Sequence, residues 1–211
     1  MSRDTSISGE GNNRSRDETI PMEDQTRASR SGGRGSKTQK EKMRPKYLDG
    51  LVFDPEKGEL SAPNGDDVIV INMAALKEIF ASVRDMLHVG SDLIWYNAGV
   101  NAGAAEGKRL KRLVAKIGEE GFLKLMADLY TNLGWGKSTV ADFDLEGRSV
   151  TMYTKNNPLV RGIRASRPVC HYIKGFYKGF SSVAFQSSNV AVVELECEAM
   201  GAEQCKFRVM W

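Results

Sequence analysis

The chain has 211 residues, with 30 Lys/Arg, 27 Asp/Glu and a formal net charge of +3, a length that suits one domain with an extension. It lacks a run of about 18 uncharged apolar residues, so we expect no membrane-spanning helix. The polar N-terminus also lacks the apolar core of a secretory signal. The 3 cysteines are an odd number, which argues against a closed disulfide framework and favours a cytoplasmic protein with metal or redox chemistry.

Residues 1–46 form a polar, basic tail with 11 Lys/Arg and 7 Asp/Glu. The remaining residues are close to neutral, which argues against nucleic-acid binding by the domain. Because the tail holds few apolar side chains to offset its ordering entropy, we expect it to be disordered. Its second half, RASRSGGRGSKTQKEKMRPK, either contacts anionic surfaces weakly and in a salt-dependent way or is a solubilising leader without a partner.

Residues 47–211 are expected to form one domain that begins with a small hairpin, LVFD and GELSA around the turn PEKG. The run VIVI, residues 68–71, predicts a strand. Asn72 then predicts the N-cap of a helix over residues 73–87, where apolar side chains recur at helical spacing. A second helix is predicted from about residue 92 to 116, and a third over residues 119–133, with Gly134 as the terminating glycine.

The second half of the domain predicts mainly strands. Alternating apolar positions indicate two strands within residues 136–156, joined around Glu146 and Gly147. Pro168 predicts the start of another helix, and residues 190–197 and 204–211 predict two final strands. We therefore expect an α+β fold, an antiparallel sheet packed with helices.

Two predicted helices carry glycines at intervals of four residues: Gly99, Gly103 and Gly107 in the first, and Gly175 and Gly179 in the second. Each glycine costs a helix about 1 kcal/mol relative to alanine, while small residues at this spacing let another backbone approach closely. We expect these helices to pack on each other, across a dimer axis or beside a ligand cavity. A homodimer through these helices is the expected assembly.

The three cysteines suggest a metal site. Cys197 ends one predicted strand and Cys205 begins the next, so a hairpin could place both thiols beside Cys170, in the first turn of the preceding helix. Zinc prefers four ligands, thiolate, imidazole or carboxylate. The spacing leaves two alternatives open, namely inert buried thiols and a zinc site whose fourth ligand is one of five residues: Glu194, Glu196, Glu198, Glu203 and His171. Strand alternation places Glu194 and Cys197 on opposite faces, unless a β-bulge or an early strand end intervenes.

The runs PVCHYIKGFYKGFSSVAF and VVELECEAMGAEQCKFRV resemble the 4-vinyl reductase-like domain family (predicted hydrocarbon-binding proteins). The segments YNAGVNAG and GWG also resemble it, and the likeness extends over about residues 50–211. The resemblance implies the ligand-binding fold of NO-signalling and Golgi-transport proteins, similar to subunits of the TRAPP vesicle-tethering complex. In aromatic-sensing members a structural zinc is held by three cysteines and one glutamate, which by motif are Cys170, Glu194, Cys197 and Cys205.

The resemblance implies a sensory module, stabilised by structural zinc, that binds a hydrophobic or aromatic small molecule and passes its output to a protein partner. Aromatic-sensing relatives contact their ligand through a histidine and a tryptophan, but neither His88 nor His171 matches that histidine by motif. Candidate cavity or core residues are Trp95, Phe122, Met126, Tyr130, Trp135, Tyr153 and Phe176. The alternatives are a reductase of tetrapyrrole (bacteriochlorophyll) metabolism and a TRAPP-like adaptor. We predict no catalytic residues, because the chain shows neither a nucleotide fingerprint nor a paired general acid and base.

Overall fold

The computed structural model describes residues 50–63 and 65–211, and the predicted tail, residues 1–46, lies outside them. The first elements form a two-stranded hairpin, β1 (Val52–Asp54) paired antiparallel with β2 (Glu59–Ser61). The predicted strand at residues 68–71 is wrong, because this segment is extended but unpaired. Its side chains are mostly in solvent, with Ile69 86% and Val70 81% exposed.

Three helices follow. Helix α2 (Met73–Leu87) begins where the sequence predicts, since the side chain of Asn72 accepts a hydrogen bond from the amide of Ala74 at 2.8 Å. Helix α3 (Gly90–Leu110) ends earlier than predicted, at a short 3-10 turn, η2 (Lys111–Leu113). Helix α4 (Val114–Asn132) contains a break at Gly118, whose φ of 69° and ψ of 174° are not helical. The break separates the first turn from the long helix that the sequence places at residues 119–133.

The remaining elements build a four-stranded sheet around one helix. The strands are β3 (Lys137–Asp144), β4 (Ser149–Lys155), β5 (Ala191–Glu196) and β6 (Cys205–Met210), in the antiparallel order β3-β4-β6-β5. Helix α5 (His171–Ala184) precedes β5, and a 3-10 turn, η3 (Glu198–Met200), lies between β5 and β6. The predicted α+β class with an antiparallel sheet is confirmed.

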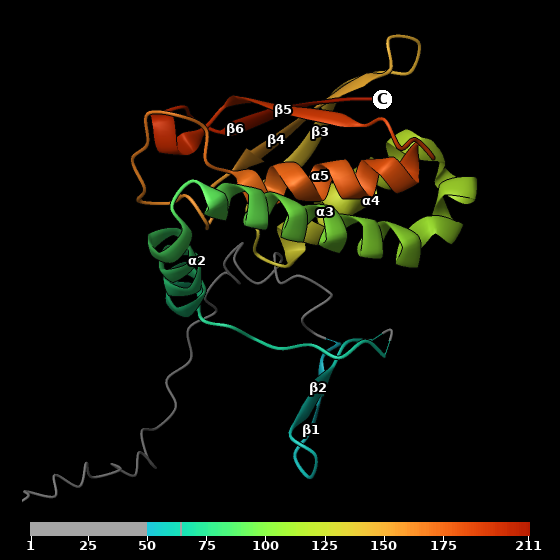
Figure 1. Ribbon diagram of the computed structural model, residues 1–211. Coiled ribbons are helices and arrows are strands. Elements are labelled where there is room, and N and C mark those ends of the chain that lie inside the picture. The colour runs from blue at the N-terminus through green and yellow to red at the C-terminus, as the bar shows by residue number, and fades with distance from the viewer. Residues whose placement is uncertain (1–49, 64) are drawn as a thin grey trace, which may run out of the picture. The chain divides into compact units, whose positions relative to one another are not determined.

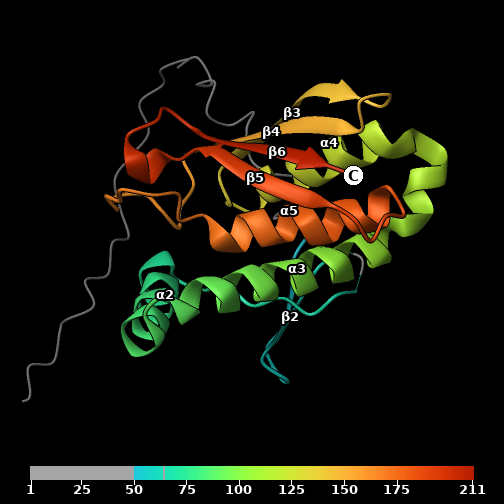
Figure 2. The ribbon, with the colours of Figure 1, turned by 45° about the horizontal axis from the view of Figure 1, so that its top comes forward.

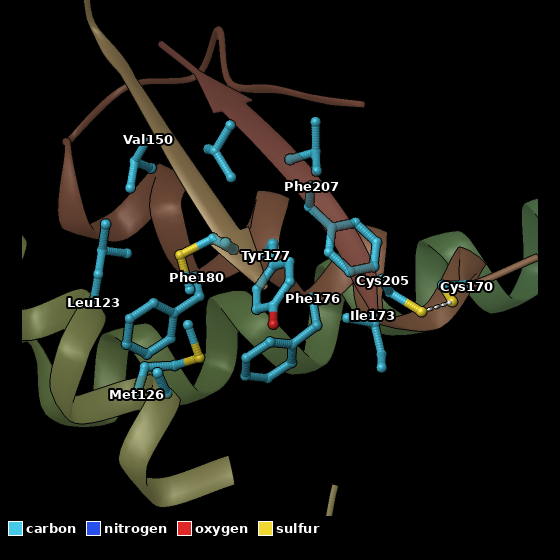
Figure 3. Close-up of a cluster of buried hydrophobic side chains, with 14 of the residues drawn as sticks. Leu123, Met126, Val150, Cys170, Ile173, Phe176, Tyr177, Phe180, Cys205 and Phe207 are labelled. Atoms are coloured by element: carbon cyan, nitrogen blue, oxygen red, sulfur yellow. Dashed lines mark hydrogen bonds between the residues drawn. The ribbon is translucent and has the colours of Figure 1, made fainter. Parts of the chain in front are cut away.

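The hydrophobic core lies between the sheet and helices α4 and α5, which cover one of its faces (Figures 1 and 2). Figure 3 shows Phe176, Tyr177 and Phe180 of α5 in this space, with Leu123 and Met126 of α4 nearby. These side chains are at most 2% exposed. The one hydroxyl among them is satisfied, because Tyr177 Oη lies 2.7 Å from Thr154 Oγ1.

Helices α3 and α5 lie side by side in Figures 1 and 2, and their glycines face each other within one chain. A Cβ on Gly99 or Gly103 would collide with backbone atoms of α5, and one on Gly175 or Gly179 with backbone atoms of α3. The first of the three predicted arrangements, packing of the helices on each other, is the one the fold uses. These glycine faces are therefore occupied inside the chain, so the homodimer stays a prediction and its interface would have to lie elsewhere.

Candidate metal cluster and ligand cavities

The cluster of three thiols and one carboxylate forms where the N-terminus of α5 meets the β5–β6 connection. Ligand atoms of Cys170, Glu194, Cys197 and Cys205 all lie within 4.8 Å of one another. Cys170 is the N-cap of α5, one residue before the first turn in which the sequence places it. Figure 3 shows Cys170 and Cys205 together beside the core cluster. The structure thus brings together the four residues that the family motif singles out.

A β-bulge allows Glu194 and Cys197 to reach the same site. The β5–β6 register shifts between Glu194 and Glu196, so the strict alternation of side chains is broken just before Cys197. This irregularity is the repair that strand parity requires. Glu194 is 8% exposed and Cys197 1% exposed, so both side chains are withdrawn from solvent on the same side.

The other candidate ligands have different partners. Glu196 pairs with Lys206 at 3.8 Å, and Glu203 pairs with Lys155. The carboxylate of Glu198 accepts the backbone amides of residues 156 and 157, at 2.6 and 2.9 Å. His171 Nε2 lies 3.2 Å from Asp92 Oδ1, on the side facing α3. Among the five alternatives, only Glu194 belongs to the cluster.

The geometry of the cluster fits a tetrahedral metal ion. The sulfur of Cys170 lies 3.8 Å from that of Cys197 and 3.5 Å from that of Cys205. Two sulfurs about 2.3 Å from a zinc ion in a tetrahedron would be roughly 3.8 Å apart, whereas a disulfide requires about 2.05 Å. One oxygen of Glu194 accepts the amide of Cys170 at 3.2 Å, while the other, Oε1, is buried without a hydrogen-bond partner. A cation would satisfy that unpaired oxygen.

The titration behaviour of the cluster indicates a concentration of negative charge that needs compensation. Burial raises the pKa of Glu194 to about 8. Hydrogen bonds to Cys197 and Cys205 raise the pKa of Cys170, and the same contacts lower that of Cys197. Without a cation, a negative charge on one group disfavours ionisation of its neighbours. A bound divalent cation reverses this effect and favours the ionised ligands.

Sequence reasoning missed the groups that support the thiols. Asn157, which is fully buried, donates from Nδ2 to the sulfur of Cys170 at 3.3 Å. The backbone amide of Glu198 donates to the sulfur of Cys205 at 3.4 Å. Hydrogen bonds of this kind orient metal ligands. Their only sequence signal is the pair Asn156–Asn157 before Pro158, which by itself indicates a turn.

A cavity of about 280 Å³ lies among α3, α4 and α5 and the segment after β2. Its aromatic wall consists of Tyr130, Trp135 and Phe176, with Tyr130 4.2 Å from Phe176 between ring centroids. Arg109 lines it as well, within an ion-pair network in which its side chain contacts Glu106 and, at 3.3 Å, Asp66. Burial raises the pKa of Tyr130 above its ordinary value, so this phenol stays protonated.

The candidate cavity residues divide among several places. Tyr130, Trp135 and Phe176 line the cavity just described, and Trp95 lines a smaller one beside α2. Phe122 and Met126 are core residues. Tyr153 is half-buried, with the ammonium of Lys206 5.7 Å from its ring centroid. His88 is exposed, while burial lowers the pKa of His171.

Comparison with known proteins supports this description. An uncharacterised protein of Methanocaldococcus jannaschii is 27% identical over 104 residues, covering 48% of this chain and 46% of that relative. The chain thus matches less than half of the relative's length. Within residues 50–63 and 65–211, no helix combines the length and apolar character needed to cross a membrane.

The solved structure of the phenol-responsive sensory domain of the transcription activator PoxR, with phenol, has a similar fold. Its TM-score is 0.67 at 19% identity, and the match covers 83% of this chain and 91% of that one. A vinyl-4-reductase family protein from Methanocaldococcus jannaschii matches at 19% identity with a TM-score of 0.49, covering 67% and 82% of the two chains. Residues 150–210 match the family model of the 4-vinyl reductase domain, which confirms the resemblance to the 4-vinyl reductase-like domain family.

Proposed function

We propose that this domain is a sensory module that binds a small hydrophobic or aromatic molecule in the cavity among α3, α4 and α5. The observation that carries the proposal is the aromatic wall of Tyr130, Trp135 and Phe176 around a space of about 280 Å³. Ligand sites are typically concave and mainly apolar, with a few polar groups that orient the ligand. The fold shared with a phenol-responsive sensory domain supports this assignment.

The metal cluster has a structural role in this proposal. Cys170, Glu194, Cys197 and Cys205 would hold zinc with three thiolates and one carboxylate, which fills a tetrahedral ion and leaves no position for catalytic water. The metal would connect the N-terminus of α5 to the β5–β6 connection. Because α5 also supplies Phe176 to the cavity wall, the zinc would keep that wall in place.

Native mass spectrometry of the full chain tests the metal and the assembly together. We expect one zinc ion per chain, its loss in Cys197→Ser, and a dimer mass. An apolar molecule retained after purification would support ligand binding. A metal-free, fully stable protein would contradict the structural zinc, and a spectral change with a tetrapyrrole and a reductant would favour a reductase instead.

Cavity-filling variants test the ligand site directly. Ala102 lines the cavity from α3, whereas Ala105 is exposed on the same helix. Phenol binding, followed by calorimetry, should be lost in Ala102→Phe and kept in Ala105→Phe. Equal binding by both variants would rule out this cavity as the phenol site.

A further inference from the structure

A second cavity, of about 130 Å³, lies between α2, the N-terminal part of α3 and the loop before α5. Phe80, Trp95 and Tyr172 supply aromatic surface to it, and the rings of Phe80 and Trp95 stack with centroids 3.7 Å apart. An apolar cavity of roughly 150 Å³ accommodates benzene. The volume therefore suits one six-membered ring, less than the cavity among α3, α4 and α5 offers.

The indole of Trp95 places a requirement on whatever fills this space. Trp95 Nε1 is buried and has no hydrogen-bond partner within residues 50–63 and 65–211. An indole N–H can only donate, and a buried donor without an acceptor costs about 1–3 kcal/mol. His171 Nε2 is a second buried polar atom on the cavity wall, and its 3.2 Å approach to Asp92 lacks hydrogen-bond geometry. An occupant with an acceptor oxygen would satisfy the indole.

The charged groups on the cavity wall favour a negatively charged acceptor. Arg84, Arg167 and Asp92 all line the cavity. Arg167 Nη2 donates to Asp92 Oδ2 at 2.7 Å, which neutralises that pair. Arg84 is exposed and forms no ion pair within the part of the chain that the structure describes. One guanidinium group is thus left for an anion, and a carboxylate matches its planar set of donors.

We propose that this cavity is a second ligand site, which takes a single-ring aromatic carboxylate. The ring occupies the space beside Phe80 and Trp95, and the carboxylate accepts from Trp95 Nε1 and pairs with Arg84. This site shares no lining residue with the cavity among α3, α4 and α5. The inference therefore does not depend on the proposed function.

Benzoate and benzamide are suitable probes, because they have nearly the same shape and only benzoate is charged. Titration of the full chain by calorimetry should show benzoate binding at least 10-fold more tightly than benzamide, as expected for a hydrogen bond to a charged group. Arg84→Gln should remove this preference. Trp95→Phe keeps an aromatic ring but removes the donor, and should weaken the binding of both probes about 10-fold.

Trp135→Phe is the matched control, since it removes an indole N–H from the other cavity and should leave benzoate binding unchanged. Arg84 is exposed, so Arg84→Gln tests the proposal even if Trp95→Phe fails to fold, which circular dichroism would reveal. Unchanged benzoate binding in both Trp95→Phe and Arg84→Gln would overturn the proposal. So would a lack of benzoate binding at millimolar concentrations, which would mean that only water fills the cavity. Phenol binding that is lost in Ala102→Phe tests the other cavity separately.

Discussion

Helices α5 and α2 are similar in length and both show an apolar stripe, yet the structure uses them differently. Eight of the 14 residues of α5 are buried, whereas none of the 15 residues of α2 is. The sheet covers one side of α5 and the glycine face of α3 meets another (Figures 1 and 2). Exposed apolar side chains remain on α2, among them Ile79 and Met86. Periodicity identifies a helix, and its neighbours decide how much of it is buried.

The largest effect should come from breaking the metal cluster at the N-terminus of α5. Cys205→Ser removes one of three thiolates, and since structural zinc contributes directly to folding, we expect unfolding to become easier by several kcal/mol. Metal content and thermal unfolding should change together. Ser182→Ala, at a half-buried position away from the cluster, is the control. A Cys205→Ser protein with wild-type stability would contradict the role of the metal.

The next largest effect should come from the α5 core. Phe180 is 0% exposed and stacks on Phe122 with ring centroids 4.6 Å apart. Phe180→Ala should lower the free energy of unfolding by about 3–5 kcal/mol, because it leaves a cavity among close-packed side chains. Denaturant unfolding at equilibrium measures this difference. A loss below about 1 kcal/mol would show that α5 is packed no better than α2.

The contact between α3 and α5 should be sensitive to a single methyl group. A Cβ on Gly103 would collide with backbone atoms of Phe176 and Phe180, which cannot rotate away. Gly103→Ala should therefore cost about 1–3 kcal/mol by overpacking, despite the better helix propensity of alanine. Gly90→Ala is the matched control, since its Cβ would lie 3.9 Å from the nearest side-chain atom. A stabilised Gly103→Ala protein would mean that the helices are farther apart.

A smaller effect, on the order of 1 kcal/mol, should appear as pH dependence in the metal-free protein. Burial raises the pKa of Glu194 from 4.5 to about 8 in the folded state. Folding therefore favours the protonated carboxyl, so stability is highest below pH 4.5 and falls as the pH rises from 4.5 towards 8. Glu194→Gln should flatten this part of the profile. An identical profile in both proteins would show that other groups cause it.

The smallest effect should come from α2. Ile79 is 48% exposed and lies in a helix without buried residues, so Ile79→Ala should change stability by no more than about 0.5 kcal/mol. The same denaturant series used for Phe180→Ala gives the comparison. A loss above about 2 kcal/mol would indicate that a partner covers α2 in solution.

Local signals predicted much of this fold correctly. Asn72 marks the start of α2 and Gly134 follows α4, because capping depends on neighbouring residues alone. The run at residues 68–71 misled, since β-branched residues form a strand only where a partner strand supplies hydrogen bonds. Glu194 came from the family motif, since no local rule locates the bulge that brings it to Cys197.

What the sequence did not predict depends on contacts between distant segments. The cavity beside α2 combines Phe80, Trp95 and Tyr172, which come from three separate helices. The second layer around the thiols combines Asn157 with a backbone amide of η3. Neither arrangement has a spacing that could be read along the chain, because the distances that matter are set by packing.

The glycine contact between α3 and α5 has a mechanical consequence. Because the glycines recur every four residues and face backbone atoms directly, a small slide of one helix along the other would drive backbone into a neighbouring side chain. The next position at which glycines again face backbone lies about 6 Å away, four residues at 1.5 Å each. Any signal that crosses this pair must therefore move both helices as one rigid lever, or advance in whole helical turns like a ratchet.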